Sequence, residues 1–115
     1  MSEVRLRRVE SLLREEISSL ILSGKIKDPR VGSFIIVSRV EVSKDIHYAK
    51  VFISSFDSGE TLDASAEALN HAAGFVQQHV GRKLTIRYTP KLTFYADRSI
   101  EQGFEITKKI RDLQS

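Results

Sequence analysis

Residues 62–81 repeat their apolar side chains at the spacing of an α-helix, and this stretch constrains the fold of the 115-residue chain more than any other. Because a helix takes about 3.6 residues per turn, positions in alternating steps of four and three share one face, which predicts a buried helix face. Gly74 lies inside the pattern, where a glycine costs a helix about 1 kcal/mol relative to alanine. Behind Ala72 and Ala73, it indicates either a bend between two half-helices or a straight helix with one tolerated glycine, and the pattern leaves both open. The periodic residues are Leu62, Ala66, Leu69, Ala73, Val76 and Val80.

The composition is that of an ordinary globular protein, with 41% hydrophobic and 29% charged residues. Its length predicts one domain, residues 1–115, with a modest core. Cysteine is absent, which excludes disulfides and thiolate chemistry. No apolar run approaches the length of a membrane span, and the first residues lack the apolar centre of a signal peptide. We therefore expect a cytoplasmic monomer with no membrane partner.

The net charge of +3 is unevenly distributed along the chain. Residues 56–81 contain four acids and no Lys or Arg, whereas residues 82–98 contain five bases and one acid. This segregation gives a polyanion a place to dock, although a lopsided solvated surface would produce the same pattern.

The order of predicted elements is helix, strand, strand, bent helix, strand, helix. A short connection at residues 43–45 makes the first two strands an antiparallel hairpin. The long helical crossover allows the third strand to pair in parallel, which predicts an α+β fold with a three-stranded mixed sheet and helices packed on one face. Pro90 cannot donate to a sheet ladder, so the third strand lies at an edge or contains a break. The predicted ranges are 4–22, 34–43, 46–56, 62–81, 84–96 and 100–113.

Two basic segments are not explained by local structure. Arginines crowd the first half of the first helix, where the helix dipole disfavours positive charge, and this hints at an external partner. Three more bases surround the Asp28-Pro29 turn, which does not require them. These residues are Arg5, Arg7, Arg8, Lys25, Lys27 and Arg30.

Nothing in the sequence has the spacing of a catalytic or metal site. His47, His71 and His79 do not match a zinc motif, and there is no phosphate-binding loop or nucleophile elbow. Asp45 and His47 stand two apart beside the hairpin turn, an arrangement that could orient a metal but is more often polar surface. We expect no enzyme activity, no cofactor and no metal.

Four segments, in their order along the chain, carry a resemblance to a known family. They are DPRVG at 28–32, VEVSKDIHYAKVFIS at 40–54, the helix around Ala72-Ala73-Gly74, and PKLTFYADRSIEQG at 90–103. Together they resemble the bacterial ribosome-binding factor A family over about residues 5–113. The resemblance implies a type II KH-like fold, αββααβ plus a C-terminal helix. It also implies an Ala-x-Gly bend at Ala72, Ala73 and Gly74, where RNA-binding KH domains carry a Gly-x-x-Gly loop.

The resemblance further implies a non-enzymatic ribosome biogenesis factor that binds the free 30S subunit. Such factors assist late maturation and processing of 16S rRNA, matter most in the cold, and leave before translation. Ribosomal proteins and other assembly factors are further expected partners. Family members often carry a longer C-terminal tail, whereas this chain ends at Ser115, so no function of such a tail is expected.

Without a Gly-x-x-Gly loop, the usual KH clamp on about four nucleotides is lost, and the acidic segment 56–81 repels phosphate. We therefore expect rRNA contacts on basic residues elsewhere, with the shape of folded rRNA supplying selectivity. Arg82 and Lys83 could instead neutralise the end of the preceding helix, and Arg87 and Lys91 could be the wet face of an edge strand. The predicted rRNA-binding residues are Arg5, Arg7, Arg8, Lys25, Lys27, Arg30, Arg82, Lys83, Arg87 and Lys91.

The alternative function is a general single-strand RNA-binding domain that uses a basic, aromatic sheet face. Aromatic side chains among bases can stack on unpaired nucleotides. The same rings could instead cover a second small core or pack under the terminal helix, and packing is the commoner role of aromatic residues. The residues concerned are Tyr48, Phe52 and Tyr95 with Lys50, Arg87 and Lys91.

Overall fold

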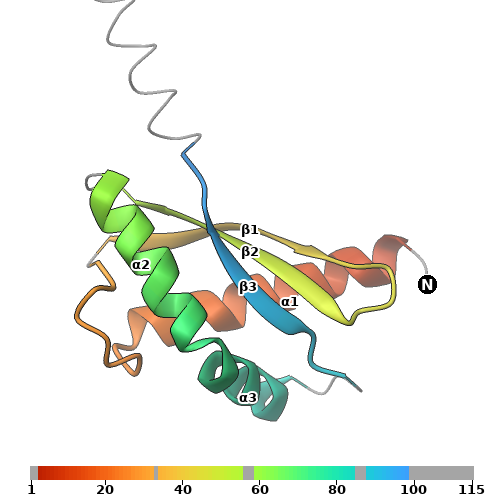
Figure 1. Cartoon of the computed structure of the whole chain (residues 1–115). Coiled ribbons are helices and arrows are strands. Elements are labelled where there is room, and N and C mark those ends of the chain that lie inside the picture. Colours follow the sequence, from red (N-terminus) through yellow and green to blue (C-terminus); the bar gives the residue numbers. More distant parts are fainter. Residues whose placement is uncertain (1–2, 33, 56–58, 85–87, 99–115) are drawn as a thin grey trace, which may run out of the picture.

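The computed structural model describes residues 3–32, 34–55, 59–84 and 88–98 of the chain. Its elements follow the predicted order αββααβ (Figure 1). They are α1 (Glu3–Leu22), β1 (Ile35–Val42), β2 (Tyr48–Ser55), α2 (Gly59–His71), α3 (Ala73–Lys83) and β3 (Lys91–Ala96). The helix predicted at 100–113 lies outside the described residues. None of the described helices is long and apolar enough to span a membrane.

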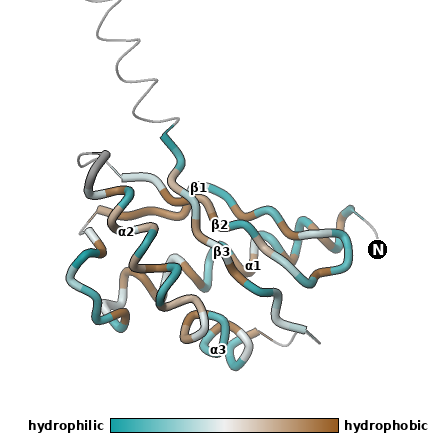
Figure 2. The backbone as a smooth tube through the Cα atoms, in the orientation of Figure 1, coloured by the Kyte–Doolittle hydropathy of each residue, from teal (hydrophilic) through white to brown (hydrophobic). Residues whose placement is uncertain are grey.

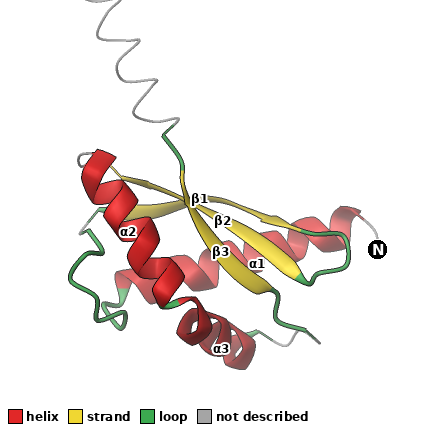
Figure 3. Cartoon of the chain, viewed as in Figure 1, coloured by secondary structure: helices red, strands yellow, loops and turns green. Residues whose placement is uncertain are grey.

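The three strands form one mixed sheet in the order β1-β2-β3 (Figure 3). β1 and β2 are an antiparallel hairpin, and β3 pairs with β2 in parallel. The mixed sheet is therefore confirmed, with β2 in the centre and β3 at an edge.

The prediction of a third strand over 84–96 is wrong at residues 84 and 88–90, because β3 begins only at Lys91, and residues 85–87 lie outside the described residues. Pro90 has no N–H to offer the sheet. The carbonyl of Thr89 accepts a hydrogen bond of 3.2 Å from the Gln77 side chain, which holds this segment against α3. Pairing starts where the Lys91 N–H donates to the His47 carbonyl at 2.9 Å. The edge position and the break at Pro90 are both present.

All three helices pack on one face of the sheet, as predicted. The central strand buries Ala49, Val51 and Ile53 on that face. Figure 2 shows hydrophobic positions along the strands and recurring along the helices. The spacing of the apolar residues in α1 predicts one buried face, and the structure buries it at Val9, Leu13, Ile17 and Leu20.

The bend in the long helical stretch is confirmed. α2 ends at His71 and α3 begins at Ala73, with Ala72 between them at φ −91° and ψ 5°. The periodic face nevertheless continues across the break, because Leu69 and Val76 on either side are both fully buried. A Cβ built on Gly74 meets no atom within 4 Å. The turn in direction is therefore made at Ala72, and packing among the described residues does not require a glycine at 74.

A β-bulge in β1 changes which side chains face the helices. Val37 pairs with Ile53 but Arg39 pairs with Phe52, so Ser38 is the extra residue. The Ser38 hydroxyl donates to the Phe52 carbonyl at 3.1 Å. Because side chains alternate along a strand, one extra residue switches the alternation and turns Arg39 toward the open face of the sheet.

Candidate nucleic-acid interface

The hairpin turn between β1 and β2 is held by one carboxylate. Asp45 Oδ1 accepts hydrogen bonds from the Ser43 hydroxyl at 2.7 Å and from the His47 N–H at 3.2 Å. These bonds, the one from Ser43 first, lower the pKa of Asp45. The side chain thus stabilises the turn, and the described residues contain no group of three or more His, Cys, Asp or Glu that could hold a metal ion.

Ile46 adopts φ 60°, in the left-handed region that β-branched residues rarely occupy. Such a conformation costs on the order of 1–3 kcal/mol and persists only where the surrounding structure enforces it. Here the Ile46 N–H donates to the Ser43 carbonyl at 2.9 Å. Ile46 thus belongs to the turn. The prediction that the second strand starts at Ile46 is wrong, because β2 starts at Tyr48.

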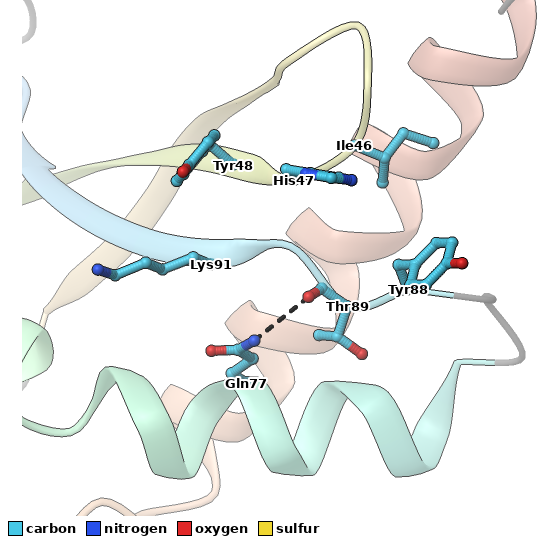
Figure 4. Close-up of a pocket in the computed structure, with 7 residues that line it drawn as sticks. All are labelled: Ile46, His47, Tyr48, Gln77, Tyr88, Thr89 and Lys91. Carbon is cyan, nitrogen blue, oxygen red and sulfur yellow. Dashed lines mark hydrogen bonds between the residues drawn. The ribbon is translucent and has the colours of Figure 1, made fainter.

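An open depression of about 400 Å³ lies between this turn, α3 and the segment that precedes β3 (Figure 4). On one side, the His47 and Tyr88 rings meet edge to face with centroids 6.3 Å apart. The opposite side of the depression is formed by Gln77 and Thr89, which are joined by a hydrogen bond. Its lining residues are Ile46, His47, Tyr48, Gln77, Tyr88, Thr89 and Lys91.

Most of the exposed bases gather at the hairpin end of the molecule. The Glu10 carboxylate accepts the Val42 N–H at 2.8 Å, which places the first half of α1 against the end of β1. The end of α3 lies beside the segment before β3, since a Cβ on Gly81 would sit 2.7 Å from the Thr89 hydroxyl. We call this the hairpin-end basic surface; it comprises Arg5, Arg7, Arg8, Lys44, Arg82, Lys83 and Lys91.

Three more of the predicted bases lie at the other end of α1, which at 20 residues is about 30 Å long. Lys25 and Lys27 follow that end of the helix. Arg30 forms ion pairs with Asp28 at 2.8 Å and with Glu67 at 3.6 Å. Of the three cations at this end, Arg30 is thus compensated by neighbouring carboxylates.

Arg30 serves as a structural link between its loop and α2. Its guanidinium donates to both Asp28 oxygens and to His71 Nδ1 at 3.0 Å. The hydrogen bonds from Arg30 lower the pKa of Asp28 from 3.8 to about 2. The buried Ser65 hydroxyl completes the link, since it donates to the Arg30 carbonyl at 3.1 Å.

The open face of the sheet carries a row of three side chains in contact, one from each strand: Arg39, Phe52 and Tyr95. Arg39 lies over the Phe52 ring, with 4.1 Å between its guanidinium carbon and the ring centroid. Phe52 stacks on Tyr95 with centroids 5.7 Å apart and planes inclined by 29°. Tyr95 is 42% exposed and the nearby Tyr48 is 62% exposed. Among the described residues, these two rings are therefore not covered by a second core.

The predicted rRNA-binding residues do not form one patch. Six of the ten join the hairpin-end basic surface, three lie at the far end of α1, and Arg87 lies outside the described residues. Sequence reasoning did not identify Lys44 and Arg39. The hairpin turn could have indicated Lys44, because residue 44 lies within the predicted turn at 43–45, but the bulge that exposes Arg39 leaves no plain signal in the sequence.

Comparison with known proteins identifies the family. The family model of ribosome-binding factor A matches residues 5–110. Ribosome-binding factor A of Treponema denticola is 46% identical over 114 residues, which cover 99% of this chain and 86% of that protein. The protein of the same name from Borreliella burgdorferi is 44% identical over 108 residues, covering 94% and 90%.

Solved structures share the fold. The crystal structure of ribosome-binding factor A from Thermus thermophilus has a TM-score of 0.69 at 23% identity, covering 82% of this chain and 98% of that one. A homology model of the Thermus thermophilus factor, fitted into the cryo-EM map of its complex with the 30S subunit, has a TM-score of 0.64 at 24% identity, covering 79% and 93%. The αββααβ order with its bend is the type II KH-like arrangement. The chain belongs to the ribosome-binding factor A family.

Proposed function

We propose that this protein is a non-enzymatic ribosome biogenesis factor that binds the free 30S subunit in the cytoplasm and assists late maturation of 16S rRNA, above all in the cold. The observation that carries the proposal is its 46% identity, over 99% of its length, to a ribosome-binding factor A. The Thermus thermophilus homologue, fitted into a map of a 30S complex, supports the choice of subunit.

The charge distribution supports the same function and indicates where contact is made. The hairpin-end basic surface offers seven cations to the phosphate backbone. Two of its acidic neighbours are engaged within the protein, Asp45 in the turn and Glu10 with the Val42 N–H. We therefore place the main rRNA contact at the hairpin end and a smaller one at Lys25 and Lys27.

Binding alone can assist maturation. A protein that binds one RNA conformation more tightly than another shifts the population toward the first, by no more than its difference in affinity. A rigid array of cations does this by fitting one arrangement of phosphates, since phosphate contacts fix position rather than sequence. Alternative RNA conformations interconvert more slowly in the cold, where such assistance has most effect.

Sedimentation tests this proposal. The protein should co-sediment in sucrose gradients with free 30S subunits and be absent from 70S ribosomes and polysomes. Cells lacking it should accumulate unprocessed 16S rRNA, more so at low temperature. Equal amounts on free subunits and polysomes would contradict the assembly role.

The absence of catalysis has a separate test. Incubation with immature subunits should leave nucleoside triphosphates and the RNA backbone intact. Hydrolysis that disappears in a His47→Ala variant would contradict the non-enzymatic mechanism.

A further inference from the structure

Two aromatic contacts lie on one continuous surface that the proposed phosphate contacts do not use. The first is the Phe52–Tyr95 stack on the open sheet face, and the second is the His47–Tyr88 pair beside the depression. Tyr48 lies between them. We call this set of five residues the aromatic track.

The strand register makes the track continuous. Phe52 pairs with Tyr95, and four residues earlier on β2 Tyr48 pairs with Lys91. At about 3.3 Å per residue, the four residues from Phe52 to Tyr48 span about 13 Å and the five from Phe52 to His47 about 17 Å. A single-stranded RNA of several nucleotides is long enough to reach both aromatic contacts. Figure 4 shows Tyr48 and Lys91 pointing away from Tyr88 at one end of the depression.

The surroundings of the track favour an anionic ligand with flat apolar groups. Lys50 and Lys91 are exposed beside it, and Arg39 extends the row over Phe52. Glu41 is the acid on this face that offsets Arg39, at 3.5 Å. Burying Lys50 and Lys91 under an apolar protein surface would cost free energy, whereas phosphates would neutralise them.

Nucleic acid in single-stranded form meets both requirements. Bases in a duplex are stacked on one another and present only their edges, whereas unpaired bases can stack on aromatic side chains. The depression, at about 400 Å³, lies within the range of small-ligand sites and has polar groups, Gln77 and Thr89, on one side.

We infer that the aromatic track binds an unpaired segment of the rRNA, with one base on the Phe52–Tyr95 stack and a nearby base in the depression beside His47 and Tyr88. The inference rests on the proposed function, which supplies the RNA. It adds a second kind of contact, because base stacking detects whether a segment is unpaired, and phosphate contacts at the hairpin end do not. The protein would thereby prefer subunits in which that segment has not yet paired.

The test is binding of a fluorescent single-stranded RNA of about 12 nucleotides to the full chain, compared with a duplex of the same length. Tyr95→Leu and Tyr88→Leu should each weaken binding of the single strand by about 5- to 150-fold, and Tyr95→Trp should preserve it. The duplex should bind all variants alike. Phe75→Leu is the matched control, because Phe75 is 44% exposed on α3, away from the track.

The inference would be overturned if Tyr95→Leu and Tyr88→Leu bound the single strand as tightly as the wild type does. It would also be overturned if the wild type failed to bind the single strand at low salt. A third contrary result is a wild-type dimer, seen by analytical ultracentrifugation, that is lost in both variants. The last would make this face a contact between two copies of the chain. Failure of the proposed function is distinguishable. A protein that binds the single strand through Tyr95 but ignores free 30S subunits would be a general single-strand RNA-binding domain.

Discussion

Gly74 and Gly81 in α3 differ in how much space an added side chain would have, although helix propensity alone predicts the same effect for both. A Cβ on Gly81 would lie 2.7 Å from the Thr89 hydroxyl, closer than real Cβ contacts come, whereas a Cβ on Gly74 would meet nothing within 4 Å. Alanine is favoured over glycine in a helix by up to about 1 kcal/mol. Gly74→Ala should therefore raise the free energy of unfolding, and Gly81→Ala should raise it less or lower it.

Urea unfolding of both variants measures the difference, and Thr89→Ala supplies the control. In a Thr89→Ala background, where the close hydroxyl is gone, Gly81→Ala should recover the gain that propensity predicts. Equal gains for Gly74→Ala and Gly81→Ala in the wild-type background would contradict the close approach of α3 to residue 89.

Asp28 makes stability depend on pH in a defined window. Its pKa is lowered to about 2 in the folded protein, from an ordinary 3.8, by the bonds from Arg30. Because the pKa of Asp28 is lower in the folded than in the unfolded chain, its ionised carboxylate stabilises the fold at pH values above 3.8. This stabilisation is lost as pH falls from 3.8 toward about 2. The stability difference between wild type and Asp28→Asn should thus be full at about pH 5 and shrink toward about pH 2. A difference that does not change with pH would mean that the carboxylate charge is not what holds the loop.

At the scale of elements, one side chain fastens α2 to the edge of the sheet. Asn70 Nδ2 donates to the Phe94 carbonyl at 3.0 Å, and the Phe94 N–H donates to Asn70 Oδ1 at 2.7 Å. Both partners belong to the outer edge of β3. Asn70→Ala should lower the free energy of unfolding by about 1–3 kcal/mol, because two backbone groups lose their bonds.

Thermal unfolding measures the effect, with Gln78→Ala on α3 as the control. Asn70→Asp should fall between wild type and Asn70→Ala, because it keeps the acceptor for the Phe94 N–H and loses the donor. If Asn70→Ala were as stable as Gln78→Ala, water would satisfy the N–H and carbonyl of Phe94 as well as the Asn70 side chain does.

The elements that follow from local periodicity could be predicted, and those that depend on pairing could not. The buried face of α1 and the periodic face of residues 62–80 are set by spacing within one segment, and both are observed. The start of β3 depends on which residue first finds a partner on β2, and the bulge at Ser38 depends on the register with β2. Neither register is a property of a single segment.

The candidate site shows the same division. Basic residues could be identified from the sequence, but their grouping follows from α1 running the length of the sheet, which places Arg7 and Arg8 about 22 Å from the end of the helix that leads to Lys25 and Lys27. Compensation of Arg30 by Glu67 joins residues 37 apart and has no local signal. The positions of Phe52 and Tyr95 on the open face could be predicted, because alternation along their strands is regular.

For the whole molecule, the two ends of α1 differ in charge and should therefore differ in their contribution to binding. The hairpin end presents seven cations, and two acids near them, Glu10 and Asp45, are engaged within the protein, whereas Arg30 at the far end is paired with carboxylates. A polyanion approaching the protein should orient toward the hairpin end before it makes contact. We therefore propose that the hairpin end makes the main contact with the free small subunit.

The salt dependence of binding to free 30S subunits tests whether the hairpin end makes that contact. The slope of log affinity against log salt falls by about one unit for every phosphate contact that a substitution removes. Arg7→Glu/Arg8→Glu and Lys25→Glu/Lys27→Glu change the charge equally near opposite ends of α1. We predict that the first pair lowers the slope by about two units and the second by less than about one. Equal reductions in the two variants, or an unchanged slope in Arg7→Glu/Arg8→Glu, would contradict a main contact at the hairpin end.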